Sequence, residues 1–145
     1  MFIIYSGDFY ITMEYNGRFG SELILDLRTD DANQAMNYTY VRNWVLSLIL
    51  DIGMEIHEIN GIPAIMTDKW KPDDIPSADG VSCLAMLTTS SLSVHTSIDE
   101  RNKDKACIFV NIFSCKDFKY DDVMKNCRHW WEGCEVMKWM HIDRI

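Results

Sequence analysis

Residues 80–96 read GVSCLAMLTTSSLSVHT, and this stretch decides the fold. Two apolar runs within it, Val81–Thr88 and Leu92–Thr96, have the composition of β-strands and flank a short polar segment. A third run of the same kind, Cys107–Cys115, follows after the charged turn Asp99–Lys105. Successive strands joined by short polar turns indicate a mostly antiparallel sheet.

Working outward from this stretch, further strands and two helices are expected. The predicted strands are Asp8–Tyr15, Leu23–Leu27, Met54–Ile59 and Val136–Ile142, and the first two are expected to form a hairpin around Gly17 and Gly20. Apolar residues at three- and four-residue steps from Val41 to Ile52 predict an amphipathic helix that ends at Gly53, after candidate N-caps at Thr29, Asp30 and Asp31. A second helix is predicted from Asp121 or Asp122 to Gly133, and a surface loop over Asp68–Gly80.

These elements predict the α+β class, as a two-layer α/β sandwich with a mostly antiparallel sheet and two helices on one face. The 145 residues, 48% of them hydrophobic, suit a single domain over residues 1–145 whose core needs no metal or disulfide support.

Charge and cysteine content exclude several classes of protein. Twenty-two acidic against fourteen basic residues, a net charge of −8, argue against nucleic-acid binding and mildly favour cationic small molecules. The start of the chain does not resemble a targeting signal, and the longest apolar stretch, Trp44–Ile49, is far too short to span a membrane. The five Cys are odd in number and form no CxxC pair, so we expect reduced thiols in a cytoplasmic protein and no metal site.

Polar residues of possible chemical importance are concentrated between Ala78 and Cys115. Strand alternation puts Ser91, Ser93 and His95 on one face of their strand, and it sends Phe109, Asn111, Phe113 and Cys115 to a shared face of theirs. A His and a Cys could therefore meet across the sheet. Composition alone favours the structural alternative, a hydrogen-bonded turn with a satisfied core His and a buried Cys.

The spacing of these polar residues resembles that of a known family. Gly80-Val81-Ser82 is followed by Ser90, eight residues after Ser82, by His95-Thr96 five residues further on, and by Ile112-Phe113-Ser114-Cys115. Together these resemble prokaryotic-type S-adenosylmethionine decarboxylases, from Gly80 to Thr96 and again from Ile108 to Cys115.

The resemblance implies an enzyme that makes its own cofactor. Ser90 would attack the carbonyl of Thr89, and the chain would separate into residues 1–89 and a fragment 90–145 headed by a pyruvoyl group derived from Ser90. By resemblance Ser82 assists this step, and His95 is the base that removes the α-proton of the esterified serine. The pyruvoyl group would form a Schiff base with S-adenosylmethionine, with Cys115 as the acid that protonates the α-carbon after decarboxylation. The family also implies a homodimer of processed protomers and a role in spermidine biosynthesis.

The sequence departs from the family pattern where substrate is expected to bind. Ser97-Ile98-Asp99 stands where the family usually has Trp-Pro-Glu, so Asp99, or Glu100 beside it, would inherit the contact with the ribose hydroxyls. Thr89 replaces a common Glu before the processed serine, and Asn111 replaces an Asp. The loop between Asp99 and Ala106 is also longer.

Two other functions remain open at this point. The altered turn at Ser97-Ile98-Asp99 is compatible with a pyruvoyl-dependent decarboxylase of ornithine or arginine. It is also compatible with a catalytically inactive paralogue that binds an active partner as a regulatory subunit, although intact Ser90, His95 and Cys115 argue against this.

Overall fold

A computed structural model describes residues 2–6, 9–13, 19–70 and 79–144 of the chain. Its strands are β1 (Phe2–Ser6), β2 (Phe9–Met13), β3 (Gly20–Thr29), β4 (Glu58–Ile59), β5 (Ile62–Pro63), β6 (Ile65–Trp70), β7 (Gly80–Leu87), β8 (Ser90–Ile98), β9 (Ala106–Ser114) and β10 (Glu135–Arg144). Its helices are α1 (Ala32–Ala35), α2 (Tyr38–Asp51) and α3 (Tyr120–Trp130).

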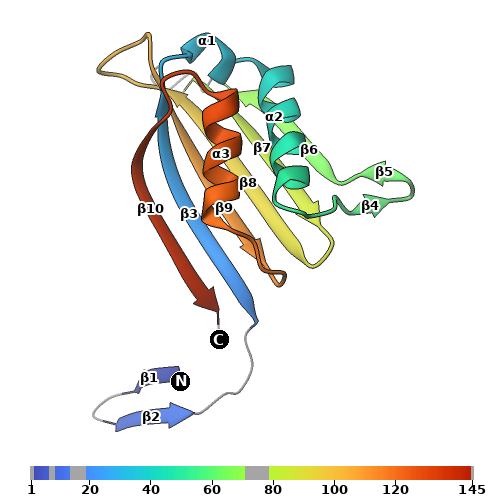
Figure 1. The fold of residues 1–145 in the computed structure, drawn as a ribbon, viewed down its shortest axis with the longest axis vertical. Helices are drawn as coiled ribbons and strands as arrows, with labels where there is room; N and C mark the ends of the chain where they lie inside the picture. The colour runs from blue at the N-terminus through green and yellow to red at the C-terminus, as the bar shows by residue number, and fades with distance from the viewer. Residues whose placement is uncertain (1, 7–8, 14–18, 71–78, 145) are drawn as a thin grey trace.

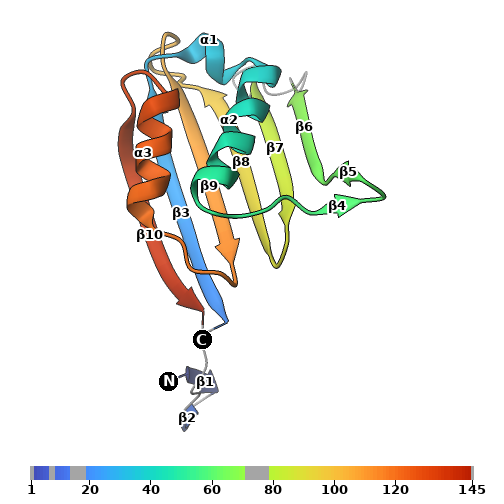
Figure 2. The same ribbon diagram turned by 45° about the vertical axis from the view of Figure 1, so that its right-hand side comes forward.

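The main sheet has six strands in the order β10-β3-β9-β8-β7-β6, and every neighbouring pair is antiparallel. All three helices lie on one face of this sheet, as Figures 1 and 2 show from two directions. The predicted α+β two-layer sandwich is therefore confirmed. The short helix α1, which the sequence did not predict, is capped by the Asp31 side chain, and Asn37 caps α2 in the same way.

The core lies between the sheet and the helices. Leu23, Leu25 and Leu27 of β3 are fully buried and alternate with less buried residues, as expected for a strand with one face on the core. The helices contribute an apolar stripe from α2 and the indole rings of Trp44 and Trp131, which meet edge to face with their ring centroids 5.0 Å apart.

A polar network fixes α3 against α2 within this apolar layer. The buried Asn126 of α3 accepts a hydrogen bond from Trp44 Nε1 at 2.9 Å, and its own amide nitrogen donates to Ser47 Oγ at 3.1 Å and to Asp51 Oδ2 at 2.7 Å. Trp130 Nε1 of α3 also donates to Ser47 Oγ of α2 at 3.1 Å, and these directional bonds together set the register of the two helices.

The opposite face of the six-stranded sheet is open. In the part of the chain that the structure describes, no helix lies over it (Figures 1 and 2). This face carries large apolar side chains that are about half exposed; Met66, Leu84, Met86, Phe109 and Met140 are examples. An apolar surface of this extent on a sheet is typical of an interaction site.

Three predictions about single elements are wrong or fall partly outside the described residues. The expected hairpin of Asp8–Tyr15 with Leu23–Leu27 is wrong, because β2 pairs with β1 whereas β3 lies between β9 and β10. Met54–Ile59 makes only one isolated bridge and the two-residue strand β4. The expected loop Asp68–Gly80 begins inside β6, and residues 71–78 lie outside the described residues, as do residues 8 and 14–17.

A search of the described helices for a membrane span was negative: none combines the necessary length with the necessary apolar character.

Replacing Asn126 with Ala should lower the free energy of unfolding by about 1–3 kcal/mol, because Trp44 Nε1 would be left buried without an acceptor. Urea denaturation of wild type and variant measures this difference. Lys125→Ala, on the exposed side of the same helix, serves as the control and should change stability by no more than about 0.5 kcal/mol. Equal effects of the two substitutions would contradict a structural role for the Asn126 network.

Candidate active site

The turn between β7 and β8 has an unusual backbone conformation. Thr88 and Thr89 form this turn, and β8 begins at Ser90. Thr89 has a φ of +71°, which is rare for a β-branched residue. A non-glycine residue in this region costs on the order of 1–3 kcal/mol and persists only when its surroundings impose the conformation. The strained residue is the one whose carbonyl belongs to the peptide bond preceding Ser90.

Three hydrogen bonds hold this turn in place. The Thr88 N–H donates to the carbonyl of Glu55 at 3.0 Å, and the Cys115 N–H donates to the carbonyl of Thr89 at 3.5 Å. The Ser90 hydroxyl donates to Ser114 Oγ at 2.9 Å. The strained turn is thus anchored to the segment after α2 and to the end of β9.

A second polar group lies further along the same strands. Ser82 Oγ and His95 Nδ1 are 2.8 Å apart, because β7 and β8 pair in a register that places these two residues side by side. Both residues alternate with buried neighbours, which puts their side chains on the open face of the sheet. Ser82 and His95, predicted from the family spacing, therefore form a pair.

The structure does not bring this pair to Ser90 within one chain. Five residues separate Ser90 from His95 on β8, which is about 16 Å along a strand. Because five is odd, the two side chains also point to opposite faces, and Ser90 shares the helix-covered face with Leu92 and Val94.

Cys115 lies near Ser90 and not near His95. Its backbone N–H contacts the carbonyl of Thr89, and its side chain is exposed just beyond the end of β9. His95 pairs instead with Phe109, six positions before Cys115. The expectation that a His and a Cys meet across the sheet is not met within a single chain.

Asp99 and Glu100 lie at the far end of β8. The Asp99 side chain is buried and is ion-paired with Arg28 Nε at 3.3 Å and with Arg101 Nε at 3.5 Å. The hydrogen bond from the Arg101 backbone N–H, together with the two guanidinium groups, holds the pKa of the Asp99 carboxyl below its usual value, against the opposing effect of burial. Asp99 therefore has protein partners already, whereas Glu100 is exposed in the following turn.

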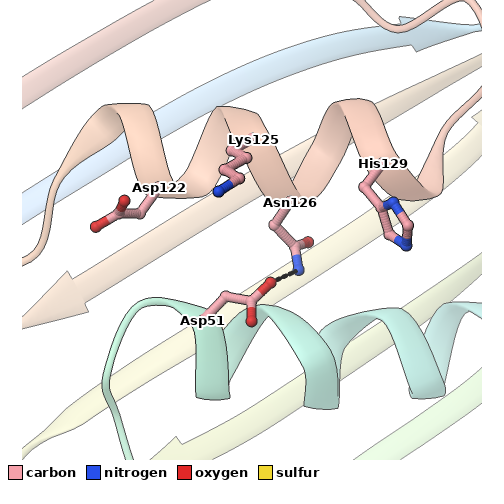
Figure 3. Close-up of a pocket in the computed structure, with 5 residues that line it drawn as sticks. All are labelled: Asp51, Asp122, Lys125, Asn126 and His129. Carbon is pink, nitrogen blue, oxygen red and sulfur yellow. Dashed lines mark hydrogen bonds between the residues drawn. The ribbon is translucent and has the colours of Figure 1, made fainter.

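Two hollows in the described surface have polar linings. One, of about 290 Å³, borders the strained turn and is lined by Gly53, Met54, Glu55, Thr88, Thr89, Ser90 and Lys116. The other, of about 320 Å³, lies between α2 and α3, where Asp51, Asp122, Lys125, Asn126 and His129 line it (Figure 3). Only the first contains predicted site residues, and it borders the peptide bond between Thr89 and Ser90.

Sequence reasoning missed Ser114 and Gly20. Ser114 is fully buried at the end of β9, where Ala106, Ile108, Val110 and Ile112 precede it on the same face. The sequence could have indicated Ser114, because it places a hydroxyl on a strand face that is otherwise apolar. A Cβ at Gly20 would lie 2.1 Å from the Ser114 carbonyl oxygen, so only glycine allows β3 to approach so closely.

The residues present suit a cofactor made from the chain itself. Ser90 follows a residue of strained backbone conformation whose carbonyl receives a backbone N–H, and an intramolecular attack by the Ser90 hydroxyl needs such a fixed and polarised carbonyl. In the described part of the chain, no three His, Cys, Asp or Glu side chains come close enough together to hold a metal ion.

Comparison with known proteins identifies a family. A family model described as S-adenosylmethionine decarboxylase matches residues 21–144, a range that runs from β3 through β10 and contains every predicted site residue. No curated protein matches the chain.

Replacing Asp99 with Asn should reduce the loss of stability, measured as the free energy of unfolding, when the pH falls into the acidic range. A carboxyl whose pKa is lowered on folding stabilises the folded state above its ordinary pKa of about 3.9, and this contribution is lost as the pH falls through the folded value. Urea midpoints measured between about pH 5 and pH 2 should fall less in the variant than in the wild type. Glu100→Gln, the same change at the exposed neighbour, is the control. A variant profile parallel to that of the wild type would contradict the ion-pairing role of Asp99.

Proposed function

Because this chain belongs to the S-adenosylmethionine decarboxylase family, we propose that it is a pyruvoyl-dependent decarboxylase of S-adenosylmethionine that cleaves itself between Thr89 and Ser90. The observation that carries this proposal is the conformation of Thr89, with a φ of +71° in the residue before the nucleophilic serine. The strained backbone of Thr89 holds the carbonyl of the 89–90 peptide bond in a fixed place beside the serine.

Self-cleavage begins with attack by Ser90 Oγ on the Thr89 carbonyl carbon. The C–N bond breaks and the amide becomes an ester, after which a base removes the α-proton of residue 90 and the carboxylate of Thr89 leaves. Loss of ammonia by reaction with water then gives the pyruvoyl group at the head of residues 90–145. His95, paired with Ser82, is the base that we propose for the second step.

The position of His95 leads us to propose that the base comes from a second copy of the chain. Within one chain the imidazole lies about 16 Å from Ser90 along β8, too far for direct proton transfer. A two-fold axis through the open face would place the Ser82–His95 pair of each copy opposite the end of β8 at which its partner's Ser90 lies. The Ser90 hydroxyl itself faces the helices, so the base would approach the α-carbon of residue 90 from the open side of this strand end. The half-exposed Leu84, Met86 and Phe109 lie on this face and would be buried in such a homodimer.

When present, the pyruvoyl group supplies a carbonyl that draws electron density from the substrate as carbon dioxide leaves. Cys115 is the acid that we propose for returning a proton to the substrate α-carbon, because its backbone already contacts the Thr89 carbonyl and its side chain is exposed there. Glu55 and Lys116 line the adjoining hollow; Lys116 Nζ already donates to the carbonyl of Gly53, so we propose Glu55 for the polar groups of the substrate.

Binding of the ribose is proposed for Glu100 in preference to Asp99. Both were expected to take this role, but Asp99 is engaged by Arg28 and Arg101, whereas Glu100 is exposed. These residues lie beyond His95, at the end of β8 opposite to Ser90, so we propose that they too would serve the partner's Ser90 in the homodimer. We propose a cytoplasmic enzyme whose product supplies aminopropyl groups for spermidine biosynthesis.

Purified protein should consist of two fragments, residues 1–89 and 90–145, with the second lacking a free amino group. Mass spectrometry measures both features. Ser90→Ala should remain a single chain, and His95→Ala should stop at the ester, which hydroxylamine cleaves. A wild-type chain that stays whole after long incubation would contradict the proposal.

The substrate is tested with the same preparation. We expect it to release carbon dioxide from S-adenosylmethionine and not from ornithine or arginine, which are assayed in parallel.

Mixing two inactive variants tests whether the base comes from the partner. In a heterodimer of Ser90→Ala and His95→Ala chains, the intact His95 of the first faces the intact Ser90 of the second. We expect the His95→Ala chain to be cleaved after co-expression with Ser90→Ala and not when it is expressed alone. Co-expression with a Ser90→Ala/His95→Ala double variant is the control. Failure of the mixed dimer to cleave would show that His95 does not act between copies.

A further inference from the structure

We propose that Ser114 is a positioning residue for self-cleavage, whose hydroxyl holds the Ser90 hydroxyl against the Thr89 carbonyl. This inference rests on the proposed function and concerns only its first step, the conversion of the 89–90 amide into an ester. It assigns the orientation of the Ser90 hydroxyl to groups within one chain, independently of where the base for the second step comes from.

The geometry around Ser114 supports this role. Ser114 Oγ accepts one hydrogen bond from Ser90 Oγ at 2.9 Å and another from the Lys116 backbone N–H at 2.9 Å. Two donors therefore converge on one oxygen, and together they fix the rotamer of the Ser114 side chain. Because the Ser90 proton is directed at Ser114, a lone pair of Ser90 Oγ is free to approach the preceding carbonyl carbon.

Adjacent backbone completes the arrangement. The N–H of Cys115, the next residue, points at the Thr89 carbonyl oxygen at 3.5 Å, which is long for a ground-state hydrogen bond. Negative charge develops on this oxygen as the carbonyl carbon becomes tetrahedral, and a shorter contact would then stabilise it. Residues 114–116 thus form a cradle in which one group orients the nucleophile and another receives the oxyanion.

The cradle is rigid because the surrounding structure leaves it little freedom. Ser114 is fully buried and pairs with Ser21 on one side and with Ser90 on the other. Gly20 packs directly against the Ser114 carbonyl, and Lys116 Nζ donates to the carbonyl of Gly53 at 2.7 Å, beyond the end of α2. Fixed positions for both the nucleophile and the oxyanion donor are what an intramolecular reaction requires.

The step is an isomerisation and balances without any other reactant. The bond from Ser90 Oγ to the Thr89 carbonyl carbon forms, and the bond from this carbon to the Ser90 nitrogen breaks. The proton leaves the Ser90 hydroxyl and is finally carried by the nitrogen, which becomes a free amine. Ser114 neither gains nor loses a proton, so its role is to orient the hydroxyl.

The test measures ester formation alone, in chains that carry His95→Ala and therefore stop after the first step. The rate at which the 89–90 bond becomes cleavable by hydroxylamine is followed on denaturing gels. Adding Ser114→Ala should slow it by about tenfold or more, because the loss of one orienting hydrogen bond leaves the nucleophile free to rotate. Ser114→Thr, which keeps the hydroxyl, should be faster than the isosteric Ser114→Val.

A matched control lies on the next strand. Ser21 is also a buried serine, paired with Ser114 on β3, and its hydroxyl makes no hydrogen bond among the described residues. Ser21→Ala should therefore leave the rate of ester formation unchanged. Thermal denaturation of every variant shows whether slow ester formation reflects the chemistry or a loss of fold. If Ser114→Ala folds poorly, the rates of Ser114→Thr and Ser114→Val can still be compared.

The outcomes separate this inference from the proposed function. If wild-type protein cleaves itself but the Thr and Val variants at position 114 form the ester equally fast, the role of Ser114 is wrong and the proposed function stands. If wild-type protein never cleaves, the proposed function fails and the positioning role fails with it. Slow ester formation in Ser114→Val, with normal rates in Ser114→Thr and Ser21→Ala, supports the inference.

Discussion

The antiparallel register of β8 between β7 and β9 is the constraint on which the rest of the site depends. It sets Ser82 beside His95 at one position and Ser90 beside Ser114 at another, with the two positions on opposite faces. A shift of one residue would send His95 into the core and Ser90 out to the open face. The apolar side chains between them, such as Leu92 and Val94, make that shift unfavourable, so hydrophobic burial also fixes the chemistry.

Much of this architecture could be predicted from the sequence, because periodicity reports which face of an element is buried. The strands 81–88, 92–96 and 107–115 and the helical stripes over 41–52 and 121–133 follow from local patterns, although the first residue of each helix does not. The partners of β3 could not be predicted. Both of its neighbours lie more than 70 residues away in the sequence, and local alternation contains no information about distant pairing.

The candidate site was predicted as a set of residues but not as an arrangement. Spacing located Ser90, His95 and Cys115, but the predicted strand began at Leu92 and left Ser90 in the turn. The opposite faces and the separation of about 16 Å follow only because β8 begins at Ser90. Asp99 illustrates a different limit, because its partner Arg28 belongs to another strand. Ser114 was missed because a serine that ends an apolar strand looks like an ordinary boundary residue, and its importance lies in a single contact across the sheet.

The order of strands has a consequence for the lifetime of a protein cut after Thr89. The first fragment contributes β3, β7 and β6 to the sheet and the second contributes β10, β9 and β8, so that β3 is enclosed by strands of the other fragment on both sides. The two fragments are therefore interlocked, and neither can leave without breaking three backbone ladders, β10–β3, β3–β9 and β8–β7. Once unfolded, however, they would have to find each other by diffusion, without the strained turn that first joined them. Such a protein persists because it unfolds slowly, and its useful life is governed by a rate more than by an equilibrium.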